Sequence, residues 1–197
     1  ICDGDQSLIV DTLFDENLTE EMLKQMKNAE KQAMESVVAL VNSHSNGDHC
    51  NGNSCVNTDV IISSESTLTE MQHESPEMMA NLLLQAKSMG DLGKYFLECF
   101  GDFKFEGITR RLPNETFTGE KKLKVGDKQV NLYEVGPAHT DGDVIVHVPQ
   151  DNIVYTGDIL FIEGHPILWA GPVSNWIKAC DMILELKPES VVPGHGP

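Results

Sequence analysis

The sequence of 197 residues predicts an α/β domain built from two β-sheets with helices packed outside them. Short apolar runs bounded by Gly, Asp or Pro recur along the whole chain and indicate strands. Longer segments with helical spacing of their apolar residues separate these runs. The order strands, helix, strands occurs twice without a linker or low-complexity segment, so we expect residues 1–197 to form one domain.

The first half of the chain is expected to alternate strands with helices. Residues 1–5 are typical of a strand already under way, and the helical segment 65–105 is Met-rich and interrupted at Pro76 and Gly90. The other elements expected here are a strand at 8–10, a helix at 17–31, a strand at 36–41 and a strand around 60–62.

The second half of the chain returns to strands and closes with one helix and one strand. Gly126 and Asp127 form a turn between two of the strands, and residues 149–151 join two others as a hairpin. The expected strands are 116–117, 123–125, 129–135, 144–148, 152–155 and 190–192, and the expected helix is 175–186.

Charge limits the classes of partner. The chain has 31 acidic and 14 basic residues, a net charge of −17. This charge repels phosphate backbones and anionic lipid headgroups, so neither nucleic acid nor a membrane is an expected partner. No apolar run approaches the roughly 20 residues that a membrane-spanning helix needs. The expected partners are a small-molecule substrate and a second copy of the chain in a homodimer.

The cysteines indicate a reducing compartment. There are five of them, an odd number, and no CxxC pair occurs. Free thiols are therefore expected, and with them a cytoplasmic location. Both ends of the sequence are typical of interrupted elements, so we expect a segment of a longer protein.

Residues that bind metals gather where strands end. His44, Asp48 and His49 follow the apolar run 37–41 within eight residues. Three further candidates, His139, Asp158 and His195, each lie in a glycine-containing loop directly after another predicted strand. Imidazole and carboxylate groups are the ligands of catalytic zinc sites, which keep one position free for water. The pattern therefore predicts a metal centre formed by four strand-end loops.

These motifs resemble the metallo-β-lactamase superfamily of hydrolases. The signature of that family is His-x-His-x-Asp-His, a distant His, an Asp after Thr-Gly or Ala-Gly, and a final Gly-His. The resemblance runs from residues 9–12 to residues 194–196. It implies a four-layer αββα sandwich with metals in a groove at the edge of the sheets.

The resemblance also implies two metal positions. The first position would use His44 and His139, the second Asp48, His49 and His195, and Asp158 would bridge them. Asn46 stands where the family has a third histidine of the first position. An amide oxygen is a poorer zinc ligand than imidazole, so we expect one tightly bound zinc at the second position and a first position that is weak or empty. Mn or Fe are alternatives, because carboxylate ligands suit harder ions.

The expected function is metal-dependent hydrolysis of an ester, lactone, thioester or amide. Asp48 would orient the attacking water, and His44 or His139, released from ligation, would act as a base or polarise the substrate. Asp158 resembles the glyoxalase-like members, which disfavours β-lactamase activity. A hydrolytic dehalogenase of the same superfamily and a non-catalytic metal-binding pseudoenzyme are the alternatives.

Other residues near the motifs receive structural interpretations. The histidines at 73, 147 and 165 are not expected to bind metal, although His165 could line the cleft. Ser43, Thr140 and Asp143 are expected to orient the ligand histidines. The remaining expectations are a buried Cys50, a Trp169 that walls the substrate groove and a Trp176 in the core.

Overall fold

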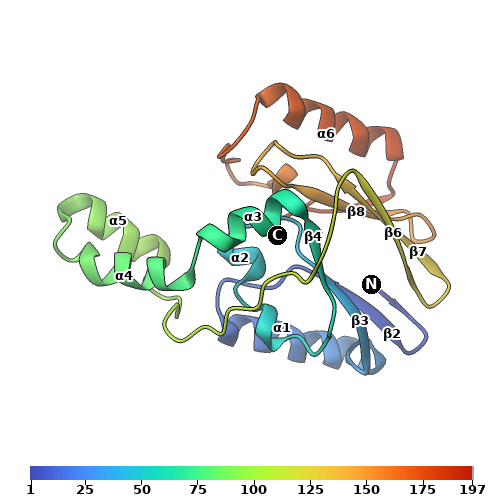
Figure 1. Ribbon diagram of the computed structural model, residues 1–197, viewed down its shortest axis with the longest axis horizontal. Coiled ribbons are helices and arrows are strands. Elements are labelled where there is room, and N and C mark those ends of the chain that lie inside the picture. Colours follow the sequence, from blue (N-terminus) through green and yellow to red (C-terminus); the bar gives the residue numbers. More distant parts are fainter. Residues whose placement is uncertain (197) are drawn as a thin grey trace.

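The structure is a computed structural model that describes residues 1–196, apart from the side chains of residues 32 and 33. Within this range, ten strands form two sheets of five strands each. The sheets lie face to face, with α1 below one of them and α6 above the other (Figure 1). The described residues therefore confirm the predicted αββα arrangement.

The first sheet has the strand order β1-β2-β3-β4-β5. β1 pairs with β2 in antiparallel orientation, and all other neighbours pair in parallel. Its strands are β1 (Cys2–Asp3), β2 (Gln6–Val10), β3 (Ser36–Val41), β4 (Ile61–Ser64) and β5 (Glu115–Phe117). The carboxyl ends of β2, β3 and β4 consequently meet at one edge.

The second sheet has the strand order β10-β9-β8-β7-β6. It is antiparallel except for the parallel pair β9 and β10. Its strands are β6 (Glu120–Val125), β7 (Lys128–Glu134), β8 (Val144–Val148), β9 (Ile153–Tyr155) and β10 (Ser190–Val192). β7, β9 and β10 each lead into a loop that carries a predicted metal ligand.

Three apolar clusters hold the four layers together. Side chains such as Val41 and Ile62 of the first sheet pack against Leu132 and Val146 of the second. A second cluster joins the outer face of β8 and β9 to α6, and a third joins the outer face of the first sheet to Leu23 of α1. β8 is buried at all five positions, because both of its faces are covered.

Two of the six helices of the described residues begin at a capping side chain. The carboxylate of Asp15 accepts a hydrogen bond from the Leu18 amide at 2.8 Å and caps α1, and Ser64 caps α3 in the same way. The helices are α1 (Glu16–Ala29), α2 (Gly47–Cys50), α3 (Glu65–His73), α4 (Pro76–Ala86), α5 (Gly90–Phe100) and α6 (Val173–Leu186). Short 3-10 turns are η1 (Lys31–Met34), η2 (Asn53–Cys55) and η3 (Gly157–Ile159).

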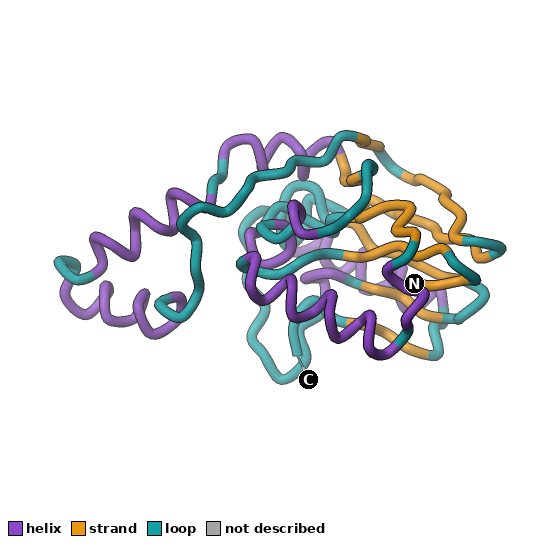
Figure 2. Tube along the Cα trace, turned by 90° about the horizontal axis from the view of Figure 1, so that it is seen from below, coloured by secondary structure: helices purple, strands orange, loops and turns teal. Residues whose placement is uncertain are grey.

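The α4–α5 pair forms a helical hairpin that projects from the sandwich. Both views place it beside the body rather than against a sheet face (Figures 1 and 2). Pro76 opens α4, and Gly90 opens α5 with a φ of +61°, a conformation that glycine adopts at little steric cost. The interruptions predicted at these two residues are thus where the hairpin begins and turns.

The predicted elements agree with the structure within a few residues, with two differences. The expected strand over residues 1–5 is limited to Cys2–Asp3, because the chain turns at Gly4 with a φ of +60°. The loop expected at Gly47–Cys50 is one helical turn, α2. A single turn is too short to show an apolar period in the sequence.

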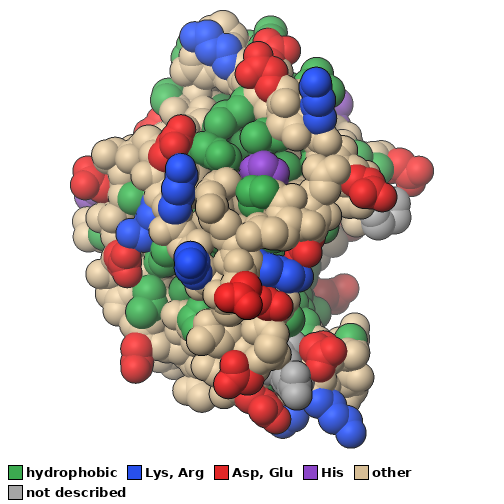
Figure 3. Space-filling model, turned by 90° about the vertical axis from the view of Figure 1, so that its right-hand side faces the viewer, with side chains coloured by type: hydrophobic (Ala, Val, Ile, Leu, Met, Phe, Trp, Pro, Cys, Tyr) green, Lys and Arg blue, Asp and Glu red, His purple; other side chains and the backbone are tan. Residues whose placement is uncertain are grey.

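Surface features agree with the charge and hydropathy analysis. Within the described residues, no helix has both the length and the apolar character needed to cross a bilayer. On the face shown in Figure 3, basic and acidic side chains are interspersed, without a continuous basic area. All five cysteines are free, and Cys50 is buried as expected.

Candidate metal centre

The predicted ligands come together at one edge of the sandwich, in the loops that follow strands. His44 lies three residues after β3, and Asp48 and His49 lie in α2. His139, Asp158 and His195 follow β7, β9 and β10 respectively. The two sheets thus contribute to the same centre, which combines residues as far apart as 44 and 195.

Glycines allow the loops from β9 and β10 to approach each other. Gly157 has a φ of +50°, and a Cβ atom there would be only 2.8 Å from Ser43 Oγ. A Cβ atom on Gly194 would collide with the Asp158 carboxylate. The Thr-Gly-Asp and Gly-His motifs therefore need glycine for close contact at the site.

The second position is formed by Asp48, His49 and His195, whose ligand atoms all lie within 4.8 Å of one another. His195 Nε2 is 3.2 Å from Asp48 Oδ2 and 3.4 Å from His49 Nε2. Asp158 reaches the same group, with Oδ1 at 3.1 Å from His49 Nε2 and Oδ2 at 3.3 Å from His195 Nε2. Four potential ligands therefore converge here.

The first position is formed by His44, His139 and Asp158, which meet the same 4.8 Å criterion. Asp158 Oδ2 is 3.2 Å from His139 Nε2 and 3.7 Å from His44 Nε2. Asp158 thus touches histidines of both positions. The three residues are buried, with side-chain exposures of 4% or less.

Each histidine of the cluster presents its Nε2 atom to the centre. The Nδ1 atoms of His44, His49 and His139 lie 2.9 Å from Ser43 Oγ, 3.0 Å from Asp11 Oδ2 and 2.7 Å from the Ile167 carbonyl. An Nδ1–H that donates to an oxygen leaves Nε2 with a free lone pair. This tautomer is the one that binds a metal through Nε2.

The donor set fits a zinc ion. Among the described residues, His44 Nε2 and Asp158 Oδ1 are buried without a hydrogen bond, although Oδ1 lies close to His49 Nε2. Buried polar atoms normally have a partner, so two buried atoms without one in the same cluster indicate that a ligand of the cluster is missing. Imidazole nitrogen and carboxylate oxygen are zinc ligands.

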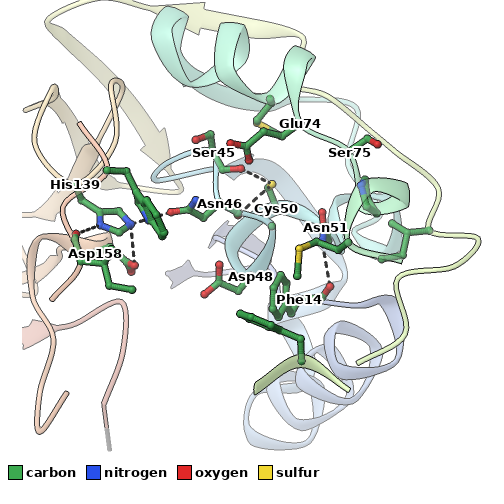
Figure 4. Close-up of a pocket in the computed structure, with 18 of the residues that line it drawn as sticks. Phe14, Ser45, Asn46, Asp48, Cys50, Asn51, Glu74, Ser75, His139 and Asp158 are labelled. Carbon is green, nitrogen blue, oxygen red and sulfur yellow. Dashed lines mark hydrogen bonds and ion pairs between the residues drawn. The ribbon is translucent and has the colours of Figure 1, made fainter. Parts of the chain in front are cut away.

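Asn46 lies in the first position. Its Oδ1 atom is 2.8 Å from His139 Nε2, and the contact is visible in Figure 4. His139 Nδ1–H donates to Ile167, so a neutral His139 has only a lone pair at Nε2, and the amide oxygen beside it cannot donate to that lone pair. A hydrogen bond between the two groups forms when the Asn46 amide is turned so that its NH2 group faces Nε2. The amide therefore competes with a metal for this nitrogen.

Asp11 supports both positions, a role that the sequence does not reveal. Its Oδ2 atom is 3.0 Å from His49 Nδ1 and accepts a hydrogen bond from Ser43 Oγ at 2.7 Å, and Oδ1 accepts from the Ser43 amide. Ser43 Oγ in turn contacts His44. The only local signal is an aspartate at the end of β2, in the left-handed region with a φ of +61°.

The expected orienting residues differ in how they act. Ser43 contacts the His44 ring directly. Among the described residues, the ring nitrogens of His139 have other hydrogen-bond partners than Thr140 and Asp143. The Asp143 carboxylate instead accepts hydrogen bonds from the amides of Ala138 and Thr140 and from Thr140 Oγ1, so it holds the loop that carries His139. Burial raises the pKa of Asp143 to about 6.

Electrostatics separate the histidines into two kinds. Burial, together with the neighbouring His49, holds the pKa of His44 well below its usual range, and burial also lowers the pKa of His139. Burial alone would lower the pKa of His49, but the hydrogen bond to Asp11 and the close contact with the Asp158 carboxylate outweigh it and raise the pKa well above normal. Hydrogen bonds to Asp158 and Asp48 raise the pKa of His195 to about 9.

Both central carboxylates are held ionised. Burial alone would raise the pKa of Asp158 and of Asp48. Hydrogen bonds from His195 and His49 outweigh burial at Asp158 and lower its pKa far below its usual range, and a hydrogen bond from His195 lowers the pKa of Asp48. Ionised oxygens are available at neutral pH for a cation.

The other histidines lie apart from the centre. His73 and His165 are exposed, and His165 does not line the cavity over the centre. His147 is buried in β8, opposite Val154, and its Nδ1 has no hydrogen bond among the described residues. A surface position or a hydrogen-bonded strand position would be the ordinary place for such a histidine, and His147 has neither, because both faces of β8 are covered.

Trp169 lies as expected, whereas Trp176 packs against the core but is only partly buried. Trp169 lines the cavity above the centre. Trp176 packs with the α6 cluster, donates from Nε1 to the Ile159 carbonyl at 2.9 Å and lies edge-on to His139, with ring centroids 5.9 Å apart.

Comparisons with known proteins identify the family and agree with the fold. Residues 1–195 match the family model of the Metallo-beta-lactamase superfamily. A metallo-beta-lactamase from Pontibacter korlensis is 22% identical, with a TM-score of 0.64 over 96% of this chain and 74% of that one. TMB-1 is 20% identical, with a TM-score of 0.62 over 100% and 76%. The DIM-1 metallo-beta-lactamase exposed to ceftazidime is 18% identical, with a TM-score of 0.64 over 100% and 75%. These structures share the fold.

Proposed function

Because the chain belongs to the metallo-beta-lactamase superfamily, we propose that it is a metal-dependent hydrolase with one tightly bound zinc at the second position. Its substrate would be a small ester, lactone, thioester or amide. The observation that carries the proposal is the convergence of Asp48, His49, Asp158 and His195, with contacts of 3.1 to 3.5 Å between their ligand atoms.

The single zinc is argued from Asn46. The first position offers three good ligands, and the fourth is an amide that already contacts His139 Nε2. Zinc would have to displace this contact and then accept an amide in place of imidazole. The second position has no such competitor, and it combines two carboxylates with two histidines.

When bound, zinc acidifies a water molecule and polarises the scissile bond. Asp48 lines the cavity with an ionised carboxylate that can orient the attacking water. His139 also lines the cavity, and its lowered pKa leaves it neutral and able to accept a proton at Nε2. His44 is fully buried and does not line this cavity, so it would act behind His139 rather than on the substrate.

Metal content and turnover test the proposal together. The purified protein, loaded with zinc and dialysed, should retain one zinc per chain by mass spectrometry. It should hydrolyse members of an ester, thioester and lactone panel, lose turnover on chelation and recover it with zinc. Two tightly held equivalents would contradict the single-zinc assignment. Retained zinc without turnover of any panel member would favour the non-catalytic alternative.

Replacement of His139 separates catalysis from metal binding. His139→Ala should lower turnover by about 100-fold or more, the usual contribution of a general base, while one zinc is retained. His73→Ala removes an exposed histidine of α3 and serves as the matched control. Loss of the zinc from His139→Ala would instead place the metal at the first position.

A further inference from the structure

A cavity of about 480 Å³ lies over the metal centre. It is lined by Asp48, His139, Asp158 and His195 at one end and by the α4–α5 hairpin at the other. Figure 4 shows His139 and Asp158 on one side of this space and Phe14 on the opposite side. The volume falls in the range of about 300 to 1,000 Å³ typical of sites for drug-sized molecules. The cavity is therefore larger than the hydrolysed bond alone requires.

The wall away from the metal ligands is apolar. This surface, called the hairpin wall, is formed by Met79, Phe96 and Phe100 of the hairpin together with Phe14, Met71 and Ile108. The rings of Phe14 and Phe100 pack edge to face with centroids 6.0 Å apart, and Phe96 continues the row at 5.8 Å from Phe100. Aromatic and methionine side chains offer a large, adaptable contact surface to an alkyl or aryl group.

Two arginines line the same cavity, and only one of them is held by hydrogen bonds to the backbone. Arg111 donates to the backbone carbonyls of Val56, at 3.0 Å, and Thr58. Arg110 is exposed and makes no hydrogen bond or ion pair with any residue that the structure describes. Its charge is felt by Glu74 and Glu77 only at longer range.

A guanidinium group without a hydrogen-bond partner is well suited to bind a carboxylate. Its planar set of donors matches the two oxygens of that group, and the contact strengthens beside an apolar wall. In a chain with a net charge of −17, the two arginines make this cavity a local exception. Glu74 also lines the cavity and interacts with Arg110 without a hydrogen bond or ion pair, so the guanidinium donors of Arg110 can still attract and bind an anion.

We propose that the substrate is an ester or thioester whose acyl chain is apolar, lies against the hairpin wall and carries a second, free carboxylate that binds Arg110. This inference rests on the proposed hydrolase function and specifies its substrate class. In the reaction, the bond between the acyl carbon and the ester oxygen or thioester sulfur breaks. Water supplies OH to the acyl carbon and a proton to the leaving group, so the product is a dicarboxylate.

A matched pair of substrate series tests the proposal. One series is the 4-nitrophenyl monoesters of α,ω-dicarboxylic acids with four to ten carbons, and the other is the 4-nitrophenyl alkanoates of the same lengths. At the best length, kcat/KM of the zinc-loaded protein should favour the anionic ester by about tenfold or more, as expected for a hydrogen bond to a charged group. Arg110→Gln should reduce this ratio to near one.

The control is Lys124→Gln, which removes one positive charge from an exposed position of β6 and should leave the ratio unchanged. A wild-type ratio near one, or a ratio that Arg110→Gln does not alter, would overturn the proposal. In the neutral series, kcat/KM should increase with carbon number until the cavity is filled. A flat series would show that the hairpin wall does not bind the acyl chain.

Binding of the product class separates this inference from the proposed function. Calorimetric titration of the zinc-loaded protein should show an α,ω-dicarboxylate of the best length binding about tenfold tighter than the monocarboxylate of equal length, and Arg110→Gln should abolish the difference. Turnover of esters without a preference for the dicarboxylate would refute the Arg110 site alone. The binding preference without turnover would refute the hydrolase and leave the anion site in place.

Discussion

The two metal positions share Asp158 but differ in access and in charge. In the first, the side chains of His44 and His139 are 1% and 2% exposed, whereas Asp48 and His195 in the second are 31% and 43% exposed. Besides Asp158, the first position contains two histidines of lowered pKa and the amide of Asn46. The second position contains the additional carboxylate of Asp48. The comparison teaches that similar ligand types can form positions of different exposure and charge, and the proposed function assigns the dication to the second position and proton transfer to the first.

Removal of the shared carboxylate should have the largest effect, because it abolishes both positions. Supporting residues around a metal ligand typically contribute 10- to 100-fold to metal affinity, so Asp158→Asn should weaken zinc binding by more than about 100-fold. Zinc retained after dialysis measures this. Asp141→Asn, at an exposed aspartate, is the control. Full retention by Asp158→Asn would mean that the metal lies elsewhere.

Replacement of Asp11, the carboxylate that supports the ligand histidines, should have the next largest effect. Asp11→Asn removes the charge that contacts His49 Nδ1, and asparagine tolerates the left-handed backbone at this position. We expect zinc affinity to fall by about 10- to 100-fold while the fold is kept. Competition with a chromophoric chelator gives the affinity, and circular dichroism verifies the fold. An unchanged affinity would contradict a supporting role for Asp11.

Completion of the first position should make the two positions alike. Asn46→His replaces the competing amide by imidazole and should raise the retained zinc from one to two per chain, with an affinity gain of about tenfold or more at the first position. Asn46→Gln keeps an amide and should retain one zinc. A single zinc in Asn46→His would show that burial, rather than the missing ligand, limits the first position.

The smallest effect concerns the metal-free protein and its dependence on pH. The pKa of His195 is raised from 6.5 to about 9, so the protonated, ion-paired form stabilises the fold below pH 6.5 and this contribution is lost as the pH rises through 9. His195 is 43% exposed, which reduces the expected loss to about 1 kcal/mol. Urea unfolding at pH 6.5 and 9 measures it.

His195→Gln provides the reference for that measurement. It should flatten the decrease in unfolding free energy between the two pH values, while the contribution of His49 remains. An equal decrease in unfolding free energy in the variant and the wild type would show that His195 does not contribute to the pH dependence.

The fold and the ligands could be predicted because their signals are local. Each strand is a short apolar run, and each ligand follows a strand directly, so the carboxyl ends of strands place His44, Asp158 and His195 at one edge. Asn46 was also visible, because it interrupts a local motif.

The remaining features depend on contacts between distant parts of the chain. The Asn46 amide meets His139 across 93 positions, and Asp11 meets His49 across 38. Arg110 lies in an irregular segment after the hairpin, and its position beside the cavity depends on how α4 and α5 project. No periodicity or spacing in the sequence reports such contacts.

The dual role of Asp11 couples the orientation of the two positions. One carboxylate fixes the ring of His49 directly and that of His44 through Ser43, so a ligand of each position depends on the same side chain. The His44 ring is therefore held in place whether or not the first position binds a metal. A histidine introduced at position 46 would accordingly meet a neighbour that is already aligned.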